Sequence, residues 1–558
     1  MSWQVNIGIY RTWRWCGGGR GGYAAYDDNE PPNAESQTIE IHHIQLRHYA
    51  SNDTGGCNNG KPHSYSYNEA LELIGNGKFQ TFLLFVCGFC LMSVINETLN
   101  MGFIISAAEC DLHLTFSDKG MLNGAAFCGV VISSHFWGFL SDTWGRRKVI
   151  LLATSVSLAF SVLSSFAVHV WMLIITRFLV GVFISGNAAT TYAYLAEFHT
   201  DKTRAKVISW AAMFMAFGMI YLPFVAYFII PLDNHFELYS SSLGMRYGLW
   251  RFYLLLSSLT SVLIIGGILG LPESGKFLLT SGEHDKVLEV LSQMYRWNKG
   301  VPDYMFPIKS ITLDAIDSAF VEQRKREINQ GLRYVWEQTV PLFRPPLVGN
   351  TVRASFLMFG LFMASSGVFM WMPDILNTYV NFKDAKLTIC DVVEIIHNNR
   401  TQMSAQNIVT SCPVSIDASI FMITTIMGIL FLACYILNGA VINLVGKKLL
   451  LNIWYVVCGV CGVAALWTSD FYLTLLVIVI FLAVGCCGSV LSAISVDLFP
   501  TNYRAMALCL ILMTGRLGAM VGSNVVGFLL TLNCEMIFIL LGGLLIVCAA
   551  IGTTLPGK

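Results

Sequence analysis

Gly138-Phe-Leu-Ser-Asp142-Thr-Trp-Gly145-Arg146-Arg147 has a second, weaker copy in this chain, Gly439-Ala-Val-Ile-Asn443-Leu-Val-Gly446-Lys447-Lys448. Each copy lies just beyond the end of a long apolar run. The repeat therefore predicts a membrane protein built from two similar halves. Such an architecture is typical of solute carriers, which bind their cargo between the repeats and alternate the side from which it is reached.

Composition supports a membrane protein. The chain has 558 residues, of which 55% are hydrophobic and 13% are charged, whereas soluble domains carry roughly 25% charged residues. The formal net charge is zero, so bulk charge gives no reason to expect a nucleic-acid partner. We expect the lipid bilayer and a small solute as partners, and a monomer as the working unit.

Apolar runs of about 20 residues, long enough to cross a bilayer, divide the chain into four parts. Residues 1–77 are polar and lack the apolar core of a secretory signal, which predicts a disordered cytoplasmic tail. Residues 78–271 hold six runs and residues 353–556 hold six more. The polar residues 272–352 between them predict a cytoplasmic loop with short helices. The fold class is thus an all-α membrane protein with twelve transmembrane helices in two pseudo-symmetric six-helix bundles.

Basic residues beside the spans set the orientation, because loops rich in Lys and Arg stay in the cytoplasm. Arg146 and Arg147 follow the second predicted span, and Lys447 follows the eighth. All fall on one side of the membrane, which predicts that both termini are cytoplasmic. The sequence leaves open whether the membrane is the plasma membrane or that of an intracellular vesicle.

The polar segment 381–415 falls on the opposite side. Its two cysteines, Cys390 and Cys412, could form a disulfide there, although spacing alone cannot prove it. Asn399-Arg400-Thr401 matches the acceptor triplet for N-glycosylation. Such short triplets also arise by chance, so the topology is what favours a glycan at Asn399.

The repeated loop motif predicts a gate. Gly138 would allow close helix contact and Gly145 a sharp turn. The Asp142 carboxylate and the guanidinium groups of Arg146 and Arg147 could form a charge-assisted latch beside the neighbouring half, which must break when the halves rock. The alternative is that the basic residues only fix the topology.

The second copy has Asn443 in place of the acid beside Lys447, so we expect a weaker latch. A further repeat supports paired gating, although each of its members could also be an ordinary interfacial ion pair. It places an acid and an arginine at one spacing beyond the fourth and tenth spans: Glu197 and Arg204, and Asp497 and Arg504.

Polar and charged residues inside the spans are candidates for substrate binding or coupling, because a charge at mid-membrane costs several kcal/mol unless it faces protein or water. Asn96 and Glu97 lie in the first span. The Glu97 carboxylate could neutralise a cationic cargo, carry a proton or pair with a neighbouring helix. Arg177 in the fourth span has no charged counterpart near Val477 of the second half. Its partner could be Glu97 or an anionic cargo.

Other candidates lie in the second half. Arg516 in the eleventh span is also unduplicated. Asp374 follows Trp371-Met-Pro373 in the seventh span, where proline can break the helix and bring the carboxylate to a cavity, although Asp374 could equally lie at the outer water interface. Tyr192 and Trp371 could line a pocket. Metal ligands do not cluster with a nucleophile and a base in the loops, so we expect neither a metal site nor an enzyme.

These motifs resemble the major facilitator superfamily over residues 79–556. Within it the chain is similar to the synaptic vesicle glycoprotein 2 and related vesicle-transporter group, near the organic cation and sugar porters. The resemblance rests on Ser106-Ala-Ala-Glu-Cys-Asp111-Leu, Pro272-Glu-Ser-Gly-Lys276 and Trp371-Met-Pro-Asp374. The chain departs from that group at Val94, which stands where a second acid would fall. It also has only the short segment 381–415 where the group has a large folded domain.

The resemblance implies a transmembrane transporter, secondary active or facilitative, that moves a small organic solute by alternating access. The solute would be an organic ion or sugar-like. We expect no cofactor, with a proton or the cargo gradient as the driving force. The alternative is a non-transporting vesicle or membrane scaffold or regulator that keeps the carrier fold, which Val94 and the weaker second latch favour.

Overall fold

The computed structural model describes residues 65–234, 239–240, 245–312, 336, 339–380, 387–395 and 418–556. The predicted glycosylation site Asn399 and the thiol of Cys412 lie outside the described residues, as does the tail up to residue 64. The side chains of Asn443 and Arg504 are not described either.

The first half consists of long helices whose ends are set by local capping. Thr115 caps the second span, because its side chain accepts a hydrogen bond from the Asp118 backbone while the Asp118 carboxylate accepts one from the Thr115 backbone. The elements of this half are α3 (Lys78–Leu99), α4 (Met101–Leu112), α5 (Phe116–Trp144), α6 (Arg146–Ser164), α7 (Val170–Glu197), α8 (Asp201–Ile229), η1 (Ile230–Asn234), β2 (Tyr239–Ser240), β3 (Met245–Arg246), α9 (Leu249–Ser257) and α10 (Leu259–Leu269).

The second half follows the same plan, and its first span is interrupted. The helix ends at Phe369 and restarts at Met372, with Pro373 in the first turn, as predicted from the Trp371-Met-Pro373 sequence. The elements are η3 (Val340–Phe343), α15 (Val348–Phe369), α16 (Met372–Tyr379), α18 (Ala418–Val445), α19 (Lys447–Ala464), η5 (Ala465–Trp467), α20 (Phe471–Leu482), η6 (Ala483–Cys487), α21 (Gly488–Leu498), α22 (Thr501–Leu532) and α23 (Glu535–Thr553).

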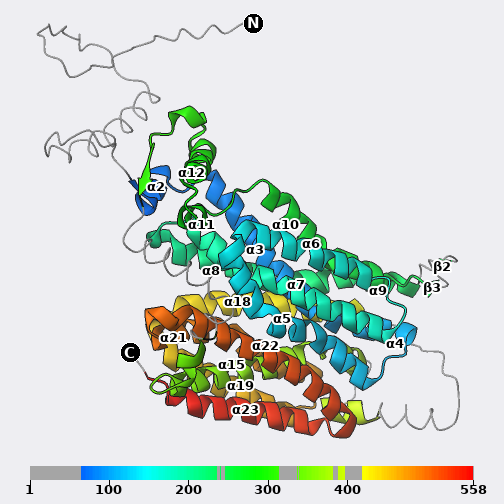
Figure 1. Ribbon diagram of the computed structural model, residues 1–558. Coiled ribbons are helices and arrows are strands. Elements are labelled where there is room, and N and C mark those ends of the chain that lie inside the picture. Colours follow the sequence, from blue (N-terminus) through cyan, green and yellow to red (C-terminus); the bar gives the residue numbers. More distant parts are fainter. Residues whose placement is uncertain are drawn as a thin grey trace, which may run out of the picture. The chain divides into compact units, whose positions relative to one another are not determined.

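Twelve spans are present among the described residues, each a helix or a pair of consecutive helices long and apolar enough to cross a bilayer. This confirms the predicted fold class. In Figure 1 the first half runs from blue to green and the second from yellow-green to red, and the two halves lie side by side. α5 packs against α22 and α8 against α18, and these two helix pairs form most of the contact between the halves.

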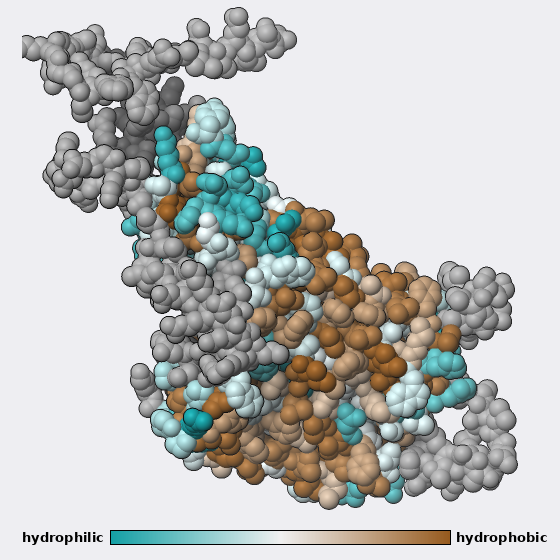
Figure 2. Space-filling view, in the orientation of Figure 1, coloured by the Kyte–Doolittle hydropathy of each residue, from teal (hydrophilic) through white to brown (hydrophobic). Residues whose placement is uncertain are grey.

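The outward-facing side chains of the spans are largely apolar. Phe85, Ile132 and Trp171 of the first half are exposed, as are Ile436 and Phe528 of the second. Figure 2 shows this as a broad hydrophobic surface over the helices, whereas hydrophilic residues gather around α12. A multi-pass membrane protein needs this surface, because its apolar side chains face lipid.

The prediction of a disordered tail over residues 1–77 is wrong for its last part. β1 (Tyr65–Ser66) pairs in parallel with β4 (Ile311–Thr312), and α2 (Tyr67–Ile74) follows. A capping box between Ser66 and Glu69 starts α2, and its apolar face packs in a core with the central segment. That segment contains the predicted short helices: α11 (Gly275–Thr280), α12 (His284–Lys299) and η2 (Asp303–Met305).

The two glycines of the loop motif behave differently. Gly145 has φ +113°, a conformation that side-chain-bearing residues rarely adopt, and Gly446 in the second copy has φ +89°. The predicted sharp turn is therefore confirmed. The predicted close helix contact at Gly138 is wrong, because a Cβ atom built there would meet nothing within 4 Å, and the same holds at Gly439.

Candidate functional site

A fully buried ion pair joins the first and fourth spans. The Arg177 NH1 donates to the Glu97 Oε2 at 3.0 Å, and the two side chains are 0% and 1% exposed. Ser161 of α6 bridges them, because its Oγ donates to Glu97 and accepts from the Arg177 NH2, each at 3.0 Å. Of the two partners that the sequence left open for Arg177, the structure therefore selects Glu97.

Further polar side chains complete this network. Ser164 also accepts from Arg177, and Asn100 accepts at 3.4 Å while donating to Ser257 of α9. Asn96 is buried one residue before Glu97, and its amide lies 3.5 Å from Thr260 in α10. Every member belongs to the first half. Because the charges are mutually compensated inside one bundle, the network holds that bundle together.

A second buried charge, Lys119 of α5, connects the two halves. Its Nζ lies 3.0 Å from Glu109 of α4 and 3.0 Å from Asp374 of α16, and the Lys119 side chain is 2% exposed. Ser106 also donates to Asp374 at 3.1 Å. Asp374 was predicted as a candidate, whereas Lys119 was missed. Its position one turn into a span, next to the capped start of α5, is the signal that could have identified it.

The residues around this ion cluster are tightly packed. We call the end of the bundles that contains Lys119, Glu109 and Asp374 the Lys119 end. Trp371 is 0% exposed; its Nε1 donates to the Ser523 carbonyl at 2.8 Å, and its ring stacks on Phe116 of the first half. Gly102 of the first half approaches the backbone of Met370 so closely that a Cβ would lie 2.7 Å from its carbonyl oxygen. Trp371 therefore packs between the halves rather than lining an open pocket.

The loop motif lies at the other end of the bundles, the Arg146 end. The Arg146 NH2 pairs with Asp142 at 2.9 Å and with Glu197 at 3.1 Å. The Arg147 backbone donates to Glu273 at 2.9 Å, and its guanidinium donates to carbonyls at the end of α10. All these partners belong to the first half and its connection to α11. The predicted latch between the halves stays a prediction.

The other repeated residues also stay within one half. Lys447 pairs with Asp497 at 2.6 Å inside the second half, where both side chains are about half exposed, at 42% and 52%. The Arg204 Nε donates to the Ala196 carbonyl at 3.3 Å. The repeated spacing thus marks equivalent places in the two halves, and the acids at these places pair with the basic residues of the loop motif.

Arg516 differs from the other charged residues inside the spans. It lies midway along α22 yet is only half-buried, and its NH1 donates to Ser134 of α5 at 3.3 Å. Among the described residues no carboxylate forms an ion pair with it. Tyr192 of α7 lies within electrostatic reach of Arg516, and Tyr435 of α18 lies within reach of Tyr192. The structure therefore places Arg516 and Tyr192, two predicted candidates, together; Tyr435 was not singled out.

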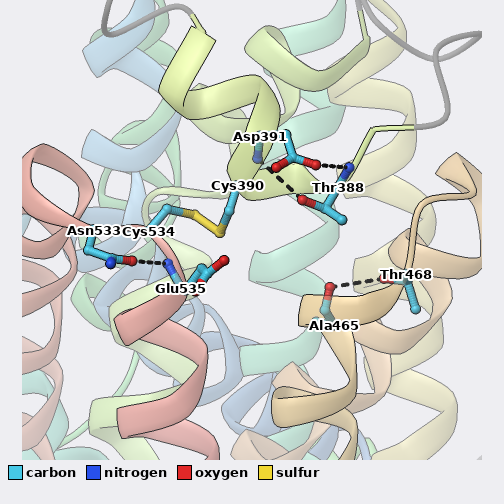
Figure 3. Close-up of a disulfide and its surroundings, with 8 residues drawn as sticks. All are labelled: Thr388, Cys390, Asp391, Ala465, Thr468, Asn533, Cys534 and Glu535. Atoms are coloured by element: carbon cyan, nitrogen blue, oxygen red, sulfur yellow. Dashed lines mark hydrogen bonds between the residues drawn. A yellow bond between two sulfur atoms is a disulfide. The ribbon is translucent and has the colours of Figure 1, made fainter.

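The disulfide prediction is wrong in its pairing. Cys390, in the helical segment 389–395, is bonded to Cys534 at the start of α23 (Figure 3). Thr388 and Asp391 cap that segment by reciprocal hydrogen bonds. Because Cys390 forms one bond only, it cannot pair with Cys412. The bridge ties the loop after the seventh span to the loop before the twelfth, two segments that are distant in sequence.

In the described part of the chain, His, Cys, Asp and Glu side chains nowhere gather in groups of three or more that could hold a metal ion. Glu97, Arg177 and Lys119 instead pair with other charged side chains, and Arg516 faces the first half. This arrangement can bind and gate a solute.

Comparison with known proteins agrees with the resemblance seen in the sequence. Residues 76–343 match the family of sugar (and other) transporters. Synaptic vesicle glycoprotein 2A of Rattus norvegicus is 31% identical over 327 residues, covering 56% of this chain and 43% of that protein. Synaptic vesicle glycoprotein 2C of Homo sapiens is 30% identical over 337 residues, covering 58% and 46%. The matched region thus spans less than half of these relatives.

Solved structures with the same fold include the xylose transporter XylE from E. coli. Its inward-open conformation aligns with a TM-score of 0.60 at 14% identity, covering 86% of this chain and 97% of that one. Its partially occluded inward-open conformation gives a TM-score of 0.59 and covers 86% and 100%. The comparisons thus agree with the similarity to the vesicle glycoproteins that the sequence indicated, and the solved structures show the same fold.

Proposed function

We propose that this chain, with its major facilitator fold and its similarity to the synaptic vesicle glycoprotein 2 proteins, carries a small organic solute across a membrane by alternating access. We further propose that it uses no cofactor and catalyses no reaction. A proton gradient or the cargo gradient would drive it. The observation that carries the proposal is the set of buried contacts that ties the two halves together at one end.

At the Lys119 end the halves are tied together by buried contacts. Lys119 and Ser106 of the first half both bind Asp374 of the second. Small residues bring the backbones close: a Cβ on Gly124 would lie 2.7 Å from the Asn524 amide of α22. Solute could not pass between the halves here without breaking these contacts.

At the Arg146 end, Arg146 and Lys447 form ion pairs within their own halves. The partners of Arg146 and Arg147 lie in the first half, and those of Lys447 lie in the second. Gly138 and Gly439 meet no neighbouring atoms. Transport then requires the contacts at the Lys119 end to open in the course of the cycle.

A reversible cross-link at the Lys119 end tests this cycle. Ser106 and Asp374 have short side chains whose oxygens lie 3.1 Å apart across the halves, so the double variant Ser106→Cys, Asp374→Cys should form a disulfide on oxidation. The purified chain would be reconstituted in liposomes and its saturable uptake measured over a panel of labelled sugars, organic cations and organic anions. We expect oxidation to abolish uptake and dithiothreitol to restore it to the level of the reduced variant.

A matched control is available inside the first half. The Thr154 Oγ1 and Asn187 Oδ1 lie 3.0 Å apart between α6 and α7, and the variant Thr154→Cys, Asn187→Cys should keep its uptake when oxidised. Undiminished uptake through the oxidised Ser106/Asp374 cross-link would contradict alternating access at this end. Absence of saturable uptake for the whole panel in the unmodified protein would instead favour a scaffold or regulator.

A further inference from the structure

Arg516 is a charge inside the spans for which the described residues supply no counter-charge. Glu97 and Arg177 compensate each other, and Lys119 has two carboxylates. In the described residues Arg516 has one hydrogen bond, to the Ser134 hydroxyl, and no carboxylate partner. A guanidinium has five N–H donors, so most of the binding capacity of Arg516 is unused.

Arg516 belongs to the second half but faces groups of the first. Its partner Ser134 belongs to α5, and Tyr192 of α7 lies within electrostatic reach. Tyr435 of α18 in the second half lies within reach of Tyr192. A charged side chain inside a span is stable only if it faces protein or water. Because Arg516 donates to Ser134, its guanidinium faces the first half rather than lipid.

The two phenol groups are available as hydrogen-bond donors. The Tyr192 hydroxyl makes one weak contact, to the Met215 sulfur at 3.9 Å. The Tyr435 hydroxyl has no hydrogen-bond partner within the described ranges. The Arg516 guanidinium and the Tyr192 phenol form a set of donors that suits an acceptor group with several oxygens. A guanidinium binds a carboxylate or a phosphate through two parallel hydrogen bonds.

We propose that Arg516 is the binding site for the anionic group of the solute, and that the solute is a small organic anion carrying a carboxylate. This deepens the proposed carrier function and rests on it. A cation would be repelled by Arg516. An uncharged solute would leave the guanidinium without a counter-charge. Because the donors come from both halves, a bound carboxylate would contact both bundles. A solute that is carried by alternating access must make such contacts.

Probe molecules of similar size but different charge show whether binding depends on the charge of the solute. Glucuronate would be compared with glucose, and benzoate with benzyl alcohol and with benzyltrimethylammonium. Binding would be measured as the shift in melting temperature of the purified full chain in detergent, and transport as uptake of the labelled probes into liposomes. We expect saturable stabilisation by glucuronate, benzoate or both, and none by the uncharged and cationic probes.

Variants test whether the Arg516 side chain is responsible for anion binding. Arg516→Gln should weaken anion binding by about tenfold to a hundredfold, the loss expected for a charge-assisted hydrogen-bonded pair. Arg516→Lys keeps the charge and should retain part of the affinity, which also covers the case in which the neutral variant fails to fold. Tyr192→Phe should weaken binding by a smaller factor. Arg296→Gln removes a guanidinium from an exposed pair on α12 and should leave binding unchanged.

The outcomes separate this inference from the carrier proposal. Anion binding that depends on Arg516 without any uptake would support the site and contradict transport. Saturable uptake of glucose or benzyltrimethylammonium that persists in Arg516→Gln would support a carrier and overturn the anion site. The inference is also overturned if neither anion stabilises the protein, or if both do so equally in Arg516→Gln.

Discussion

The two halves contain the same motif at equivalent places but bury it to different extents. In the first half Arg146 and Glu197 are 13% and 14% exposed, whereas in the second Lys447 and Asp497 are 42% and 52% exposed. Solvent weakens the attraction between exposed charges. The two copies of the motif therefore mark equivalent positions in the fold. The contribution of each ion pair to stability depends on how deeply that pair is buried.

The interiors of the two bundles also differ in how many charges they bury. The first half has the Glu97–Arg177 pair at 1% and 0% exposure. In the second half the equivalent region around Val477 is apolar, and its helices share a large hydrophobic core. We infer that buried charges specify how the helices of the first half are oriented, whereas apolar packing dominates in the second. Substitutions should therefore have unequal effects in the two halves.

The largest effect is expected for Arg177→Met. It leaves the Glu97 carboxylate buried without a counter-charge, which typically costs about 3–5 kcal/mol. The measurement is the free energy of unfolding in detergent solution, compared with Arg296→Gln, which removes a guanidinium from an exposed pair.

Replacing both members of the pair tests whether the unpaired charge of Glu97 causes the loss of stability. Glu97→Gln with Arg177→Met leaves no buried charge, and it should recover much of the stability lost in Arg177→Met alone. A double variant as unstable as the sum of its single variants would show that the two charges do not act as a pair, and the contrast between the halves would fail.

A smaller effect is expected for Glu197→Gln. The substitution removes the charge that faces Arg146 at 3.1 Å but leaves Asp142 in place at 2.9 Å. Because the hydrogen bond to a charged group is partly buried, a loss of about 1–3 kcal/mol is expected in the free energy of unfolding. An unchanged free energy would mean that Asp142 alone satisfies Arg146.

The matched change in the second half is Asp497→Asn, for which at most about 1 kcal/mol is expected because its pair is exposed. The effect should shrink further in high salt, since screening acts on exposed charges. Measuring Glu197→Gln and Asp497→Asn at two salt concentrations compares the two copies directly. Equal losses in both halves would refute the idea that burial distinguishes them.

Sequence patterns were sufficient for the helices but not for most contacts between them. Apolar runs of membrane-spanning length fixed the twelve spans, and Trp371-Met-Pro373 indicated the break in the seventh. The partner of Arg177 could not be chosen, because periodicity along one helix does not say which helix lies beside it. The Cys390 pairing failed for the same reason: proximity in sequence favoured Cys412, while the fold brings Cys534 to it.

The candidate site was only partly predictable. Arg516 was identifiable because a charge in a span is rare and costly. Tyr435 was not, because aromatic residues are common in membrane helices and most of them only pack. Lys119 was overlooked as a site residue because its position near the start of a span resembles that of an interfacial charge. Its burial becomes apparent only when α16 of the other half places Asp374 against it.

The smallest effect at neutral pH is expected at His199, which follows the fourth span. His199 is 2% exposed and Phe499, at the equivalent position of the second half, is also 2% exposed. Burial lowers the pKa of His199 below its ordinary value of 6.5, although its hydrogen bond with the Leu195 carbonyl opposes this. The folded protein therefore holds this proton less tightly than the unfolded chain does.

This difference gives His199 a pH-dependent contribution with a defined sign. Its stabilising neutral form is fully present above the unfolded pKa of about 6.5, and the contribution is lost as the pH falls below that value toward the lower folded pKa. We expect the free energy of unfolding to fall less steeply between about pH 7.5 and about pH 5.5 in His199→Phe than in the unmodified protein. Phenylalanine is the matched replacement because the second half buries it at this place. Equal slopes would show that burial of His199 does not couple protonation to folding, and that the two halves do not differ at this position.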